Sequence, residues 1–361
     1  MNIKYNCKHF KGNIPCLPNK LRDQDCRGSC DDYIEISKKI LIIKLGARGD
    51  VLRTTPLLRR YKSIYPDAQF TWVTLYPEVL PDNEIDIVYK FNGVTIFSVL
   101  KMSFDIAINL DKDIEVCLFF KEVNSKEKYG FTAHNGHIYP QTSSAKHKIL
   151  TGLFDDFSKK NTKSYLEEIF EICHLKFNYE EYYINVDESL KNIWGNTLLS
   201  KSSGKEIIGL NTGSGKRWLT RQWTEEKWIR LINLLQRHGF FVMVLGGKDE
   251  DEQNLILSTK TGCYYPGTFS IKEFIALSDS CDIIVSQVTF MMHVAIGLKK
   301  KLVLLNNIFN VHEFEMYGRG SVIQPDSGCD CYYEPFCGRP KSCMHDITAK
   351  EVFNHIIDKN I

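Results

Sequence analysis

Apolar and polar positions follow two recurring patterns along the chain, and each pattern predicts a secondary-structure element. Short apolar runs rich in β-branched residues are typical of buried strands. They cover residues 40–45, 69–74, 105–110, 207–210, 240–245, 283–285 and 302–305. Helical spacing is clearest over residues 225–238, where acidic residues open the segment and Gly239 follows it. This alternation predicts parallel sheets with helices on both faces, an α/β fold.

The alternation weakens between residues 165 and 205. A helical pattern gives way to polar sequence and then to Lys-Ser-Ser-Gly-Lys at 201–205. We expect a domain boundary at about 195–205. The chain then divides into a cysteine-rich segment (1–35), a Rossmann-like domain (36–198), a second Rossmann-like domain (199–326), and a cysteine-rich segment with a last helix (327–361).

Composition narrows the classes of protein that need to be considered. The chain has 361 residues, of which 43% are hydrophobic and 25% charged, and its formal net charge is +2. This near-neutral charge gives no nucleic-acid-binding footprint. No apolar run is long enough to span a bilayer, and the first residues lack the apolar core of a secretory signal. We expect a cytoplasmic protein, with the inner face of the membrane as another location to consider.

The most informative stretch covers residues 40–58. A buried strand runs into a turn containing Gly46 and Gly49, and apolar residues from Val51 to Tyr61 then recur at helical spacing. This places Asp50 at a helix N-terminus beyond the carboxyl end of a strand, where open α/β sheets bind ligands. Position alone fits a helix-capping aspartate equally well.

The second half has a glycine-rich turn of its own after the strand that ends at Leu210. Gly213 and Gly215 allow close backbone approach, and Lys216, Arg217 and Arg221 bring positive charge. Such a turn suits a diphosphate, although a solvated basic loop is the alternative. The spacing is not that of a Walker A loop.

Two later turns extend this pattern. Asp249 follows a strand and two glycines, which suits a contact to ribose. Thr289 and His293 follow another strand and open a helix whose backbone amides could face a phosphate. A histidine packed in the core is an equally good interpretation of His293.

Twelve cysteines are many for a cytoplasmic protein. One cluster comprises Cys7, Cys16, Cys26 and Cys30, and the other Cys329, Cys331, Cys337 and Cys343. Four thiolates suit zinc, iron or an iron–sulfur cluster, so we expect a structural metal at one or both clusters. Disulfides and free thiols are the alternatives. The scattered Cys117, Cys173, Cys263 and Cys281 fit core positions.

Together these motifs resemble glycosyltransferase family nine, the ADP-heptose heptosyltransferases of lipopolysaccharide and related surface glycans. The resemblance runs from about Lys39 to Pro325 and is carried by four segments in the family's order. The first segment is Lys44–Val51, which contains Gly-Asp-Val, and the second is Arg221-Gln-Trp223, which stands where the family has lysine-x-tryptophan. The third is the acid Asp249 after Gly-Gly, and the fourth runs from Val288 to His293. Val288 and Phe290 stand where the family has aspartate and glycine, and residues 306–310 depart from the family's pattern.

The resemblance implies a glycosyltransferase-B arrangement, with an acceptor domain and a nucleotide-sugar domain facing each other across a cleft. It implies an inverting transferase that moves heptose from ADP-heptose to a glycan, lipid-linked or protein acceptor, with no metal or other cofactor in the chemistry. Asp50 would be the catalytic base. The donor would be bound by Gly213, Ser214, Lys216, Arg217, Arg221, Asp249, Thr289 and His293. Similar proteins also imply that the last helix, 349–357, packs on the first domain.

Other interpretations remain open from sequence. Another nucleotide sugar, or a scaffold protein that kept the fold without turnover, would account for Val288 and Phe290. Asp111 and Asp113 match the short aspartate-x-aspartate pattern of metal-dependent glycosyltransferases, which is common by chance. His134 and His137 belong to a polar loop that suits the surface better than an acceptor contact.

Overall fold

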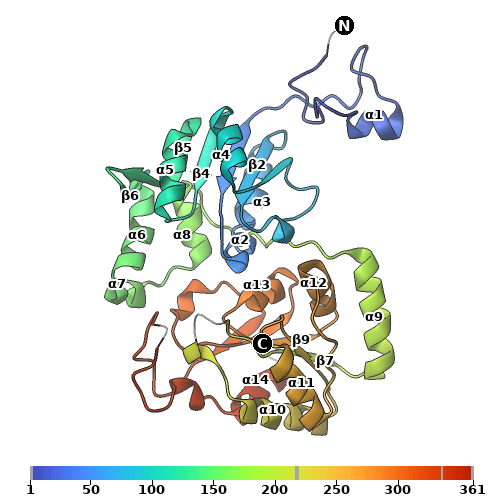
Figure 1. Ribbon diagram of the computed structural model, residues 1–361, viewed down its shortest axis with the longest axis vertical. Helices are drawn as coiled ribbons and strands as arrows, with labels where there is room; N and C mark the ends of the chain where they lie inside the picture. The colour runs from blue at the N-terminus through green and yellow to red at the C-terminus, as the bar shows by residue number, and fades with distance from the viewer. Residues whose placement is uncertain (1–2, 216–218, 335, 359–361) are drawn as a thin grey trace. The chain divides into compact units, whose positions relative to one another are not determined.

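The computed structural model describes residues 3–215, 219–334 and 336–358. The chain forms two α/β units (Figure 1). Unit 1 comprises Met1–Ile149 and Glu167–Glu180, and unit 2 comprises Leu150–Leu166 and Glu181–Ile361. The boundary expected at 198/199 falls inside a helix, Glu188–Ser202.

Unit 1 is built on a six-stranded sheet with the order β3-β2-β1-β4-β5-β6. Its strands are β1 (Lys39–Ile43), β2 (Gln69–Thr74), β3 (Ile87–Lys90), β4 (Ser103–Asn109), β5 (Asn124–His134) and β6 (His137–Pro140). All neighbouring strands are parallel except β5 and β6, which form an antiparallel hairpin. The carboxyl ends of β1 and β4 therefore lie side by side at one edge of the sheet.

Helices follow the strands of unit 1 in sequence. They are α2 (Arg48–Leu52), α3 (Pro56–Ile64), α4 (Gly93–Leu100), α5 (Ile114–Glu122), α6 (Lys146–Leu153), α7 (Asp155–Lys160) and α8 (Tyr165–Ile172). By the division into units, α7 belongs to unit 2, and α6 and α8 each contain residues of both units. The helix expected from Val51 to Tyr61 is split into α2 and α3. Pro56 opens α3 because it lacks the N–H that a continuous helix would need.

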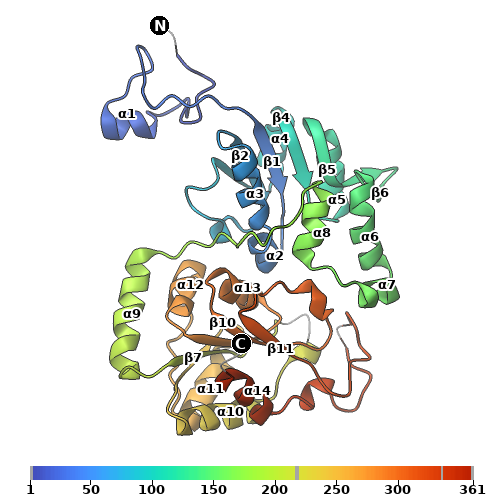
Figure 2. The same ribbon diagram turned by 180° about the vertical axis from the view of Figure 1, so that it is seen from behind.

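The first cysteine-rich segment precedes β1 and is drawn as a small lobe of its own (Figures 1 and 2). It contains one short helix, α1 (Leu17–Arg22), opened by a proline. Its ends are joined by backbone hydrogen bonds between Lys8 and Ile34 and between Ile36 and Asn6. The segment reaches the rest of unit 1 through Ser37 N–H and Lys8 Nζ, which donate to the carbonyls of Asp67 and Pro66.

Unit 2 contains a wholly parallel five-stranded sheet with the order β11-β10-β9-β7-β8. Its strands are β7 (Ile207–Asn211), β8 (Phe241–Leu245), β9 (Ile283–Gln287), β10 (Lys301–Leu305) and β11 (Gly320–Ile323). Its helices are α9 (Glu188–Ser202), α10 (Glu225–Arg237), α11 (Asp251–Thr261), α12 (Ile271–Asp279), α13 (Phe290–Gly297) and α14 (Ala349–Ile357). Helices α10, α11 and α14 lie on one side of the sheet, and α12 and α13 on the other (Figures 1 and 2).

The last helix corrects one expectation from the sequence. Helix α14 packs against α10 in unit 2, where Val352, Phe353 and Ile356 join the same buried cluster as Trp228 and Leu231. The expectation that this helix packs on the first domain is therefore wrong. The apolar faces of α10 and α14 pack against each other, so α14 covers one side of the core of unit 2.

The seven strands expected from apolar runs all form, and the α/β class with two Rossmann-like units is confirmed. Helix α10 begins at the expected residue and ends one residue early, at Arg237. The linker expected at 195–205 is wrong over most of its length, because α9 continues to Ser202. Strands β3, β5, β6 and β11 were not expected. Along β5, four of the eleven residues from Asn124 to His134 are charged or histidine, so a search for apolar runs does not find this strand.

Candidate functional site

Asp50 lies in the third position of α2, just beyond the carboxyl end of β1. Its Oδ2 accepts a hydrogen bond of 3.0 Å from the backbone N–H of Ala47, and its Oδ1 lies 2.8 Å from an Arg53 guanidinium nitrogen. About a third of the side chain is exposed (32%). These contacts hold an ionised carboxylate in place while part of it still faces solvent, so both interpretations from sequence, helix capping and catalysis, fit the same residue.

A buried ion pair lies under the Asp50 turn. Lys44 Nζ and Asp111 Oδ1 are 2.5 Å apart, and the backbone N–H of Leu45 donates to the other oxygen of Asp111. Burial raises the pKa of Asp111, and the Lys44 charge opposes that shift. Asp111 thus joins the end of β4 to the end of β1. Its carboxylate is engaged by Lys44, which argues against the metal interpretation of Asp111 and Asp113.

In unit 2, the glycine-rich turn after β7 is closely packed. A Cβ atom on Gly213 would lie 2.5 Å from a carboxylate oxygen of Glu250, so only glycine fits there without a shift. Gly215 has a φ of +73°, a conformation that favours glycine. Ser214 is buried, and its hydroxyl has no hydrogen-bond partner among the described residues. Lys216 and Arg217 lie outside the described residues.

Arg221 is almost wholly buried at this edge of the sheet, at 8% exposure. Its guanidinium donates to the backbone carbonyls of Ser214 and Val288, which follow β7 and β9. Burial lowers its pKa to about 10, so the group stays charged near neutral pH. Arg221, the predicted phosphate-binding arginine, therefore also links the loop after β7 to the loop after β9. Its guanidinium carbon lies 5.3 Å from the ring centroid of Phe309.

The loop after β9 opens α13, as the sequence predicts. The Thr289 side chain caps the helix by accepting from the Met291 N–H, and the Asn211 amide donates to the Thr289 hydroxyl at 3.3 Å. His293 lies one turn further on and is 7% exposed, with its ring stacked on Tyr182 at 6.3 Å between centroids. His293 is therefore a buried histidine in the first turns of the helix.

Asp249 is exposed in the turn after β8. The next residue, Glu250, accepts a hydrogen bond from the Gly247 N–H at 2.9 Å and packs against Gly213. The acid that touches the glycine-rich turn in this structure is thus Glu250, which the sequence analysis did not single out. A shift of one residue in matching the Gly-Gly-x-x-acid spacing accounts for this omission.

Two further polar residues at this edge escaped the sequence analysis. Gln287 ends β9, is fully buried, and has no hydrogen-bond partner for either amide atom among the described residues. Asn307 follows β10, and its amide donates to the Thr220 carbonyl at 3.0 Å and to the Cys343 sulfur at 3.5 Å. Both follow apolar runs, and that position at the carboxyl end of a parallel strand is the signal that could have singled them out.

The C-terminal cysteines are brought together within unit 2. The sulfurs of Cys329 and Cys331 are 3.3 Å apart, and the Cys343 sulfur accepts a hydrogen bond from the Asn307 amide at 3.5 Å. The hydrogen bond from Cys329, helped by the Asn307 amide, lowers the pKa of Cys343 to about 6. The same contact with Cys343, together with burial, raises the pKa of Cys329.

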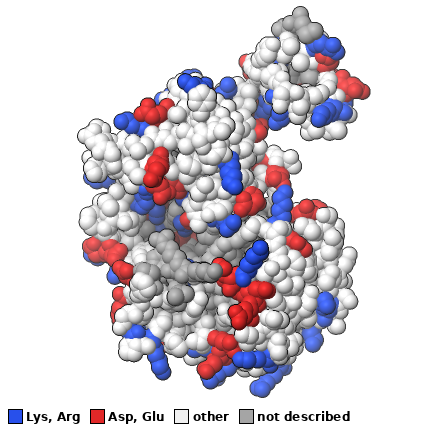
Figure 3. Space-filling view, in the orientation of Figure 1, with Lys and Arg blue, Asp and Glu red and all other residues white. Residues whose placement is uncertain are grey.

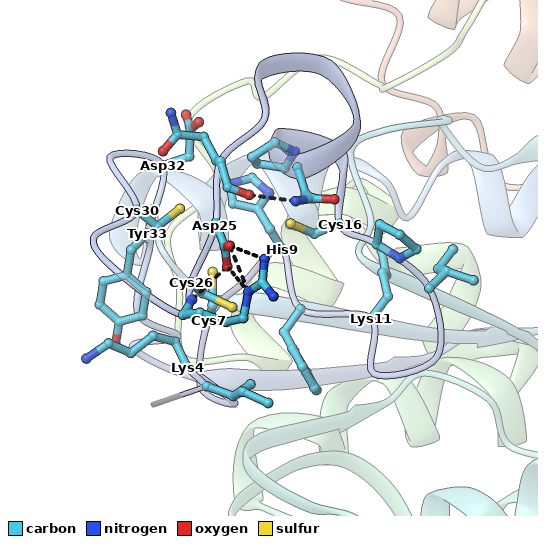
Figure 4. Close-up of a pocket in the computed structure, with 18 residues that line it drawn as sticks. Lys4, Cys7, His9, Lys11, Cys16, Asp25, Cys26, Cys30, Asp32 and Tyr33 are labelled. Atoms are coloured by element: carbon cyan, nitrogen blue, oxygen red, sulfur yellow. Dashed lines mark hydrogen bonds and ion pairs between the residues drawn. The ribbon is translucent and has the colours of Figure 1, made fainter. Parts of the chain in front are cut away.

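The N-terminal cysteines line a cavity of about 310 Å³ in unit 1 (Figure 4). Cys7, Cys16, Cys26 and Cys30 come from separate turns of the chain, and His9 also lines the cavity. The scattered cysteines 117, 173, 263 and 281 are buried, as expected for core residues.

The single-ion geometry expected at both clusters is not found. Within residues 3–215, 219–334 and 336–358, no group of three or more His, Cys, Asp or Glu side chains is placed to hold a metal ion. In the C-terminal cluster the sulfurs of Cys329 and Cys331 contact each other, and the four N-terminal cysteines line a cavity. The structure therefore does not support the two expected metal sites, which were assigned to Cys7, Cys16, Cys26, Cys30, Cys329, Cys331, Cys337 and Cys343.

The charged surface agrees with the near-neutral composition. Basic and acidic side chains are interspersed over the face drawn in Figure 3. His134 and His137 are exposed in the β5–β6 hairpin, which favours the surface interpretation of that loop. None of the helices in the described part of the chain combines the length and the apolar character needed to cross a membrane.

The fold and these loops define a glycosyltransferase with two Rossmann-like units, and comparisons with known proteins identify the family. Residues 96–319 match the model of glycosyltransferase family 9 (heptosyltransferase), and the chain belongs to that family. A relative, lipopolysaccharide heptosyltransferase 3 of Escherichia coli, is 20% identical over 295 residues, which cover 71% of this chain and 80% of the relative.

Two solved structures share the fold. The family 9 glycosyltransferase of Veillonella parvula gives a TM-score of 0.66 at 18% identity, over 89% of this chain and 96% of that one. The ADP-heptose lipopolysaccharide heptosyltransferase II of E. coli gives 0.64 at 18% identity, over 88% and 97%. The protein is thus an enzyme of the heptosyltransferase type.

Proposed function

We propose that the protein transfers a heptose from ADP-heptose to a glycan, lipid-linked or protein acceptor, with inversion at the anomeric carbon. The observation that carries the proposal is the Asp50 carboxylate, held by Ala47 N–H and Arg53 at a helix N-terminus and still partly exposed. A solved relative whose name includes ADP-heptose supports the choice of donor. The cytoplasm is the location that goes with this proposal.

In the proposed reaction, Asp50 takes the proton from an acceptor hydroxyl. The acceptor oxygen forms a bond to the anomeric carbon while the bond from that carbon to the diphosphate oxygen breaks. The bonding electron pair leaves with ADP. Arg53 lies 2.8 Å from Asp50 and holds its carboxylate in place before the transfer.

We assign the donor to the loops that follow the strands of unit 2. Gly213 and Ser214 offer a turn closely packed against Glu250, and Arg221 fixes that turn to the β9 loop while carrying a positive charge. Lys216 and Arg217 would add charge against the diphosphate. Thr289 and His293 stand at the start of α13, where oriented amides favour a phosphate, and Asp249 is the candidate for the ribose.

A second candidate is a protein that binds a different nucleotide sugar, with or without turnover. Val288 and Phe290 favour it, because they replace an aspartate and a glycine of the family's motif. Val288 offers only its backbone carbonyl to Arg221, and Phe290 adds bulk at the first residue of α13. Both changes alter the chemistry of the donor pocket and leave the scaffold intact.

We retain a structural metal, zinc or iron or an iron–sulfur cluster, as part of the proposal for the cysteine segments. Thiolates are strong ligands for these metals, and both segments have few apolar residues with which to build a core. The N-terminal cavity has room for a group larger than one ion.

A donor screen tests the proposed function. The full chain is mixed with ADP-, UDP- and GDP-linked sugars, and binding and slow hydrolysis are measured for each. We expect ADP-heptose to bind most tightly and to be hydrolysed to ADP. Preference for a UDP- or GDP-sugar would select the second candidate, and binding without release of nucleotide by any donor would indicate a protein without turnover.

A further inference from the structure

The side chain of Gln287, the last residue of β9, is fully buried and makes no hydrogen bond. Its exposure is 0%, and neither the oxygen nor the nitrogen of its amide has a partner among the described residues. Asn254 and Asn307 are also buried in unit 2, but each keeps one amide atom in a hydrogen bond, with the Thr212 hydroxyl and with the Thr220 carbonyl respectively. A buried amide without partners lowers stability, so Gln287 requires an explanation of its own.

The residues around Gln287, by contrast, are joined to each other. The Asn211 amide nitrogen lies 3.4 Å from the Ser286 hydroxyl and 3.3 Å from both the Thr289 hydroxyl and the Gly213 carbonyl. The Ser286 hydroxyl donates to the backbone carbonyl of Gln287 at 2.7 Å. The turn after β7 and the residues on both sides of Gln287 therefore form one hydrogen-bonded network, and the Gln287 side chain takes no part in it.

A second polar side chain beside Gln287 is also left over. Arg221 donates to the carbonyls of Ser214 and Val288, so one guanidinium spans the turn after β7 and the residue that follows Gln287. The Ser214 hydroxyl is buried and has no hydrogen-bond partner among the described residues. Two unpartnered polar side chains thus follow the neighbouring strands β7 and β9, at the edge of the sheet to which the donor was assigned.

The Arg221 loop, residues 219–227, is held in turn by residues 342–347. Trp223 Nε1 donates to a backbone carbonyl of that segment at 3.0 Å. Lys227 Nζ donates to three of its backbone carbonyls, those of Met344, His345 and Ile347. These contacts fix the loop, so Arg221 keeps the turn after β7 and the end of β9 at one separation. Such a fixed frame is what a preformed binding site requires.

The order of the strands indicates which part of a nucleotide sugar would meet Gln287. Strand β7 lies between β8 and β9. Asp249, the candidate for the ribose, follows β8, and the glycine-rich turn proposed for the diphosphate follows β7. Neighbouring strands are about 4.8 Å apart, so the end of β9 lies about one strand spacing beyond the diphosphate turn. In the donor, the group beyond the diphosphate is the sugar that is transferred.

The chemistry of the amide also favours a sugar over a phosphate. The nitrogen of Gln287 donates hydrogen bonds and its oxygen accepts them. A diphosphate offers only acceptors, so it would leave the amide oxygen unpartnered. A hydroxyl group both donates and accepts, and two neighbouring hydroxyls of one sugar can satisfy both amide atoms. The side chain of Val288, the next residue, has no polar atom that could serve instead.

We infer that the Gln287 amide binds hydroxyl groups of the transferred sugar and thereby selects that sugar. The inference rests on the proposed function in one respect, that the loops after β7 and β8 bind the nucleotide. Gln287 takes no part in proton transfer. It discriminates against a sugar that lacks the matching hydroxyl, because the buried amide is then left without a partner.

The first test compares ADP with ADP-heptose by calorimetry on the full chain. Gln287→Met keeps the length of the side chain and removes both polar atoms. We expect the Kd for ADP-heptose to rise about tenfold, the effect of one lost hydrogen bond, and the Kd for ADP to stay within about a factor of two, because ADP lacks the transferred sugar. Gln236→Met, in α10, is the matched control and should change neither value. Equal effects on both ligands, or no effect on either, would overturn the inference.

The second test asks whether Gln287 serves the fold instead. Without nucleotide, the Tm of Gln287→Met should equal or exceed that of the wild type, because the variant loses an amide that has no partner. A Tm lower by several degrees together with an unchanged Kd for ADP-heptose would show that a buried water satisfies this amide, and the inference would be wrong. Gln287→Asn keeps the amide but shortens the side chain by one methylene group. It gives a second variant in which the Kd should rise for ADP-heptose alone.

The outcomes separate this inference from the proposed function. If the wild type binds ADP-heptose no more tightly than ADP, the nucleotide site stands and the role of Gln287 is wrong. If the wild type binds neither ligand but binds another nucleotide sugar, the proposed donor is wrong, and the same comparison of that nucleotide sugar with its nucleoside diphosphate decides the role of Gln287. Far-ultraviolet circular dichroism of each variant shows whether a weakened affinity belongs to a folded protein.

Discussion

At the scale of single residues, the structure explains why the same positions serve packing and chemistry. Asp50 both caps α2 and presents a carboxylate to solvent, and Arg221 both ties two loops and keeps a charge at the carboxyl edge of the sheet. Sequence patterns identified both residues because glycine turns after buried strands are local features. They did not identify Glu250, Gln287 or Asn307, because the contact of Glu250 with Gly213 and the burial of Gln287 and Asn307 depend on segments far away in the sequence.

Replacement of Asp50 by asparagine tests the catalytic base. The amide can still accept from Ala47 N–H but cannot take a proton, so turnover should fall by roughly 100-fold or more. Thermal unfolding and ADP binding should stay close to those of the wild type. Asp113→Asn, in the same unit, is a matched control and should keep most activity. Near-normal turnover in Asp50→Asn would remove this residue from the mechanism.

Replacement of Arg221 separates charge from bracing. Arg221→Ala should weaken ADP binding by about 1.5–3 kcal/mol, the scale of a charge-assisted contact. Arg221→Lys keeps the charge but cannot reach the carbonyls of Ser214 and Val288 with one planar group, so an intermediate loss is expected. Calorimetry with ADP measures both. Equal affinity in all three proteins would exclude Arg221 from the donor site.

At the scale of elements, local periodicity decided which predictions succeeded. Buried strands such as β1 and β10 were found because every residue after the first is apolar. The edge strands β3 and β6 escaped because one of their sides is left open and their residues are mixed. The sequence of α14 could not show which helix it packs against, because an apolar face indicates that a helix is buried on one side but does not identify the neighbouring element.

The packing of α14 on α10 makes a stability prediction. Phe353 is buried in the core cluster of unit 2, so Phe353→Ala should lower the free energy of unfolding by about 3–5 kcal/mol. Ile357→Ala, on the same helix but 46% exposed, should cost about 1 kcal/mol or less. Denaturant unfolding followed by tryptophan fluorescence compares the two. Similar losses in both variants would show that α14 contributes little to this core.

At the scale of the whole molecule, the chain divides its tasks between its parts. The proposed base lies in unit 1 and the proposed donor loops in unit 2. Each cysteine segment belongs to one unit, the first to unit 1 and the second to unit 2. The sequence predicted two Rossmann-like halves, but the irregular cysteine spacings could not show that Cys329 and Cys331 contact each other or that the four N-terminal cysteines line a cavity.

This division predicts the effect of removing the first segment. A chain that starts at Ser37 should bind ADP within about a factor of two of the full chain, because distant sites contribute independently and the proposed donor residues belong to unit 2. Its metal content should fall by whatever Cys7, Cys16, Cys26 and Cys30 hold. Calorimetry and elemental analysis of the two chains provide the comparison. A large loss of ADP affinity would contradict independent parts.

The support of the Arg221 loop by residues 342–347 has a consequence for protein synthesis. On the ribosome, unit 1 and all the strands of unit 2 emerge before these residues do, and domains generally fold as they emerge. The carbonyls that hold Trp223 and Lys227, and the helix that closes the core, emerge only after the five-stranded sheet of unit 2 has left the exit tunnel. A nascent chain should therefore gain its affinity for nucleotide only once residues 342–357 have emerged, and chains that stop before them should be released without it.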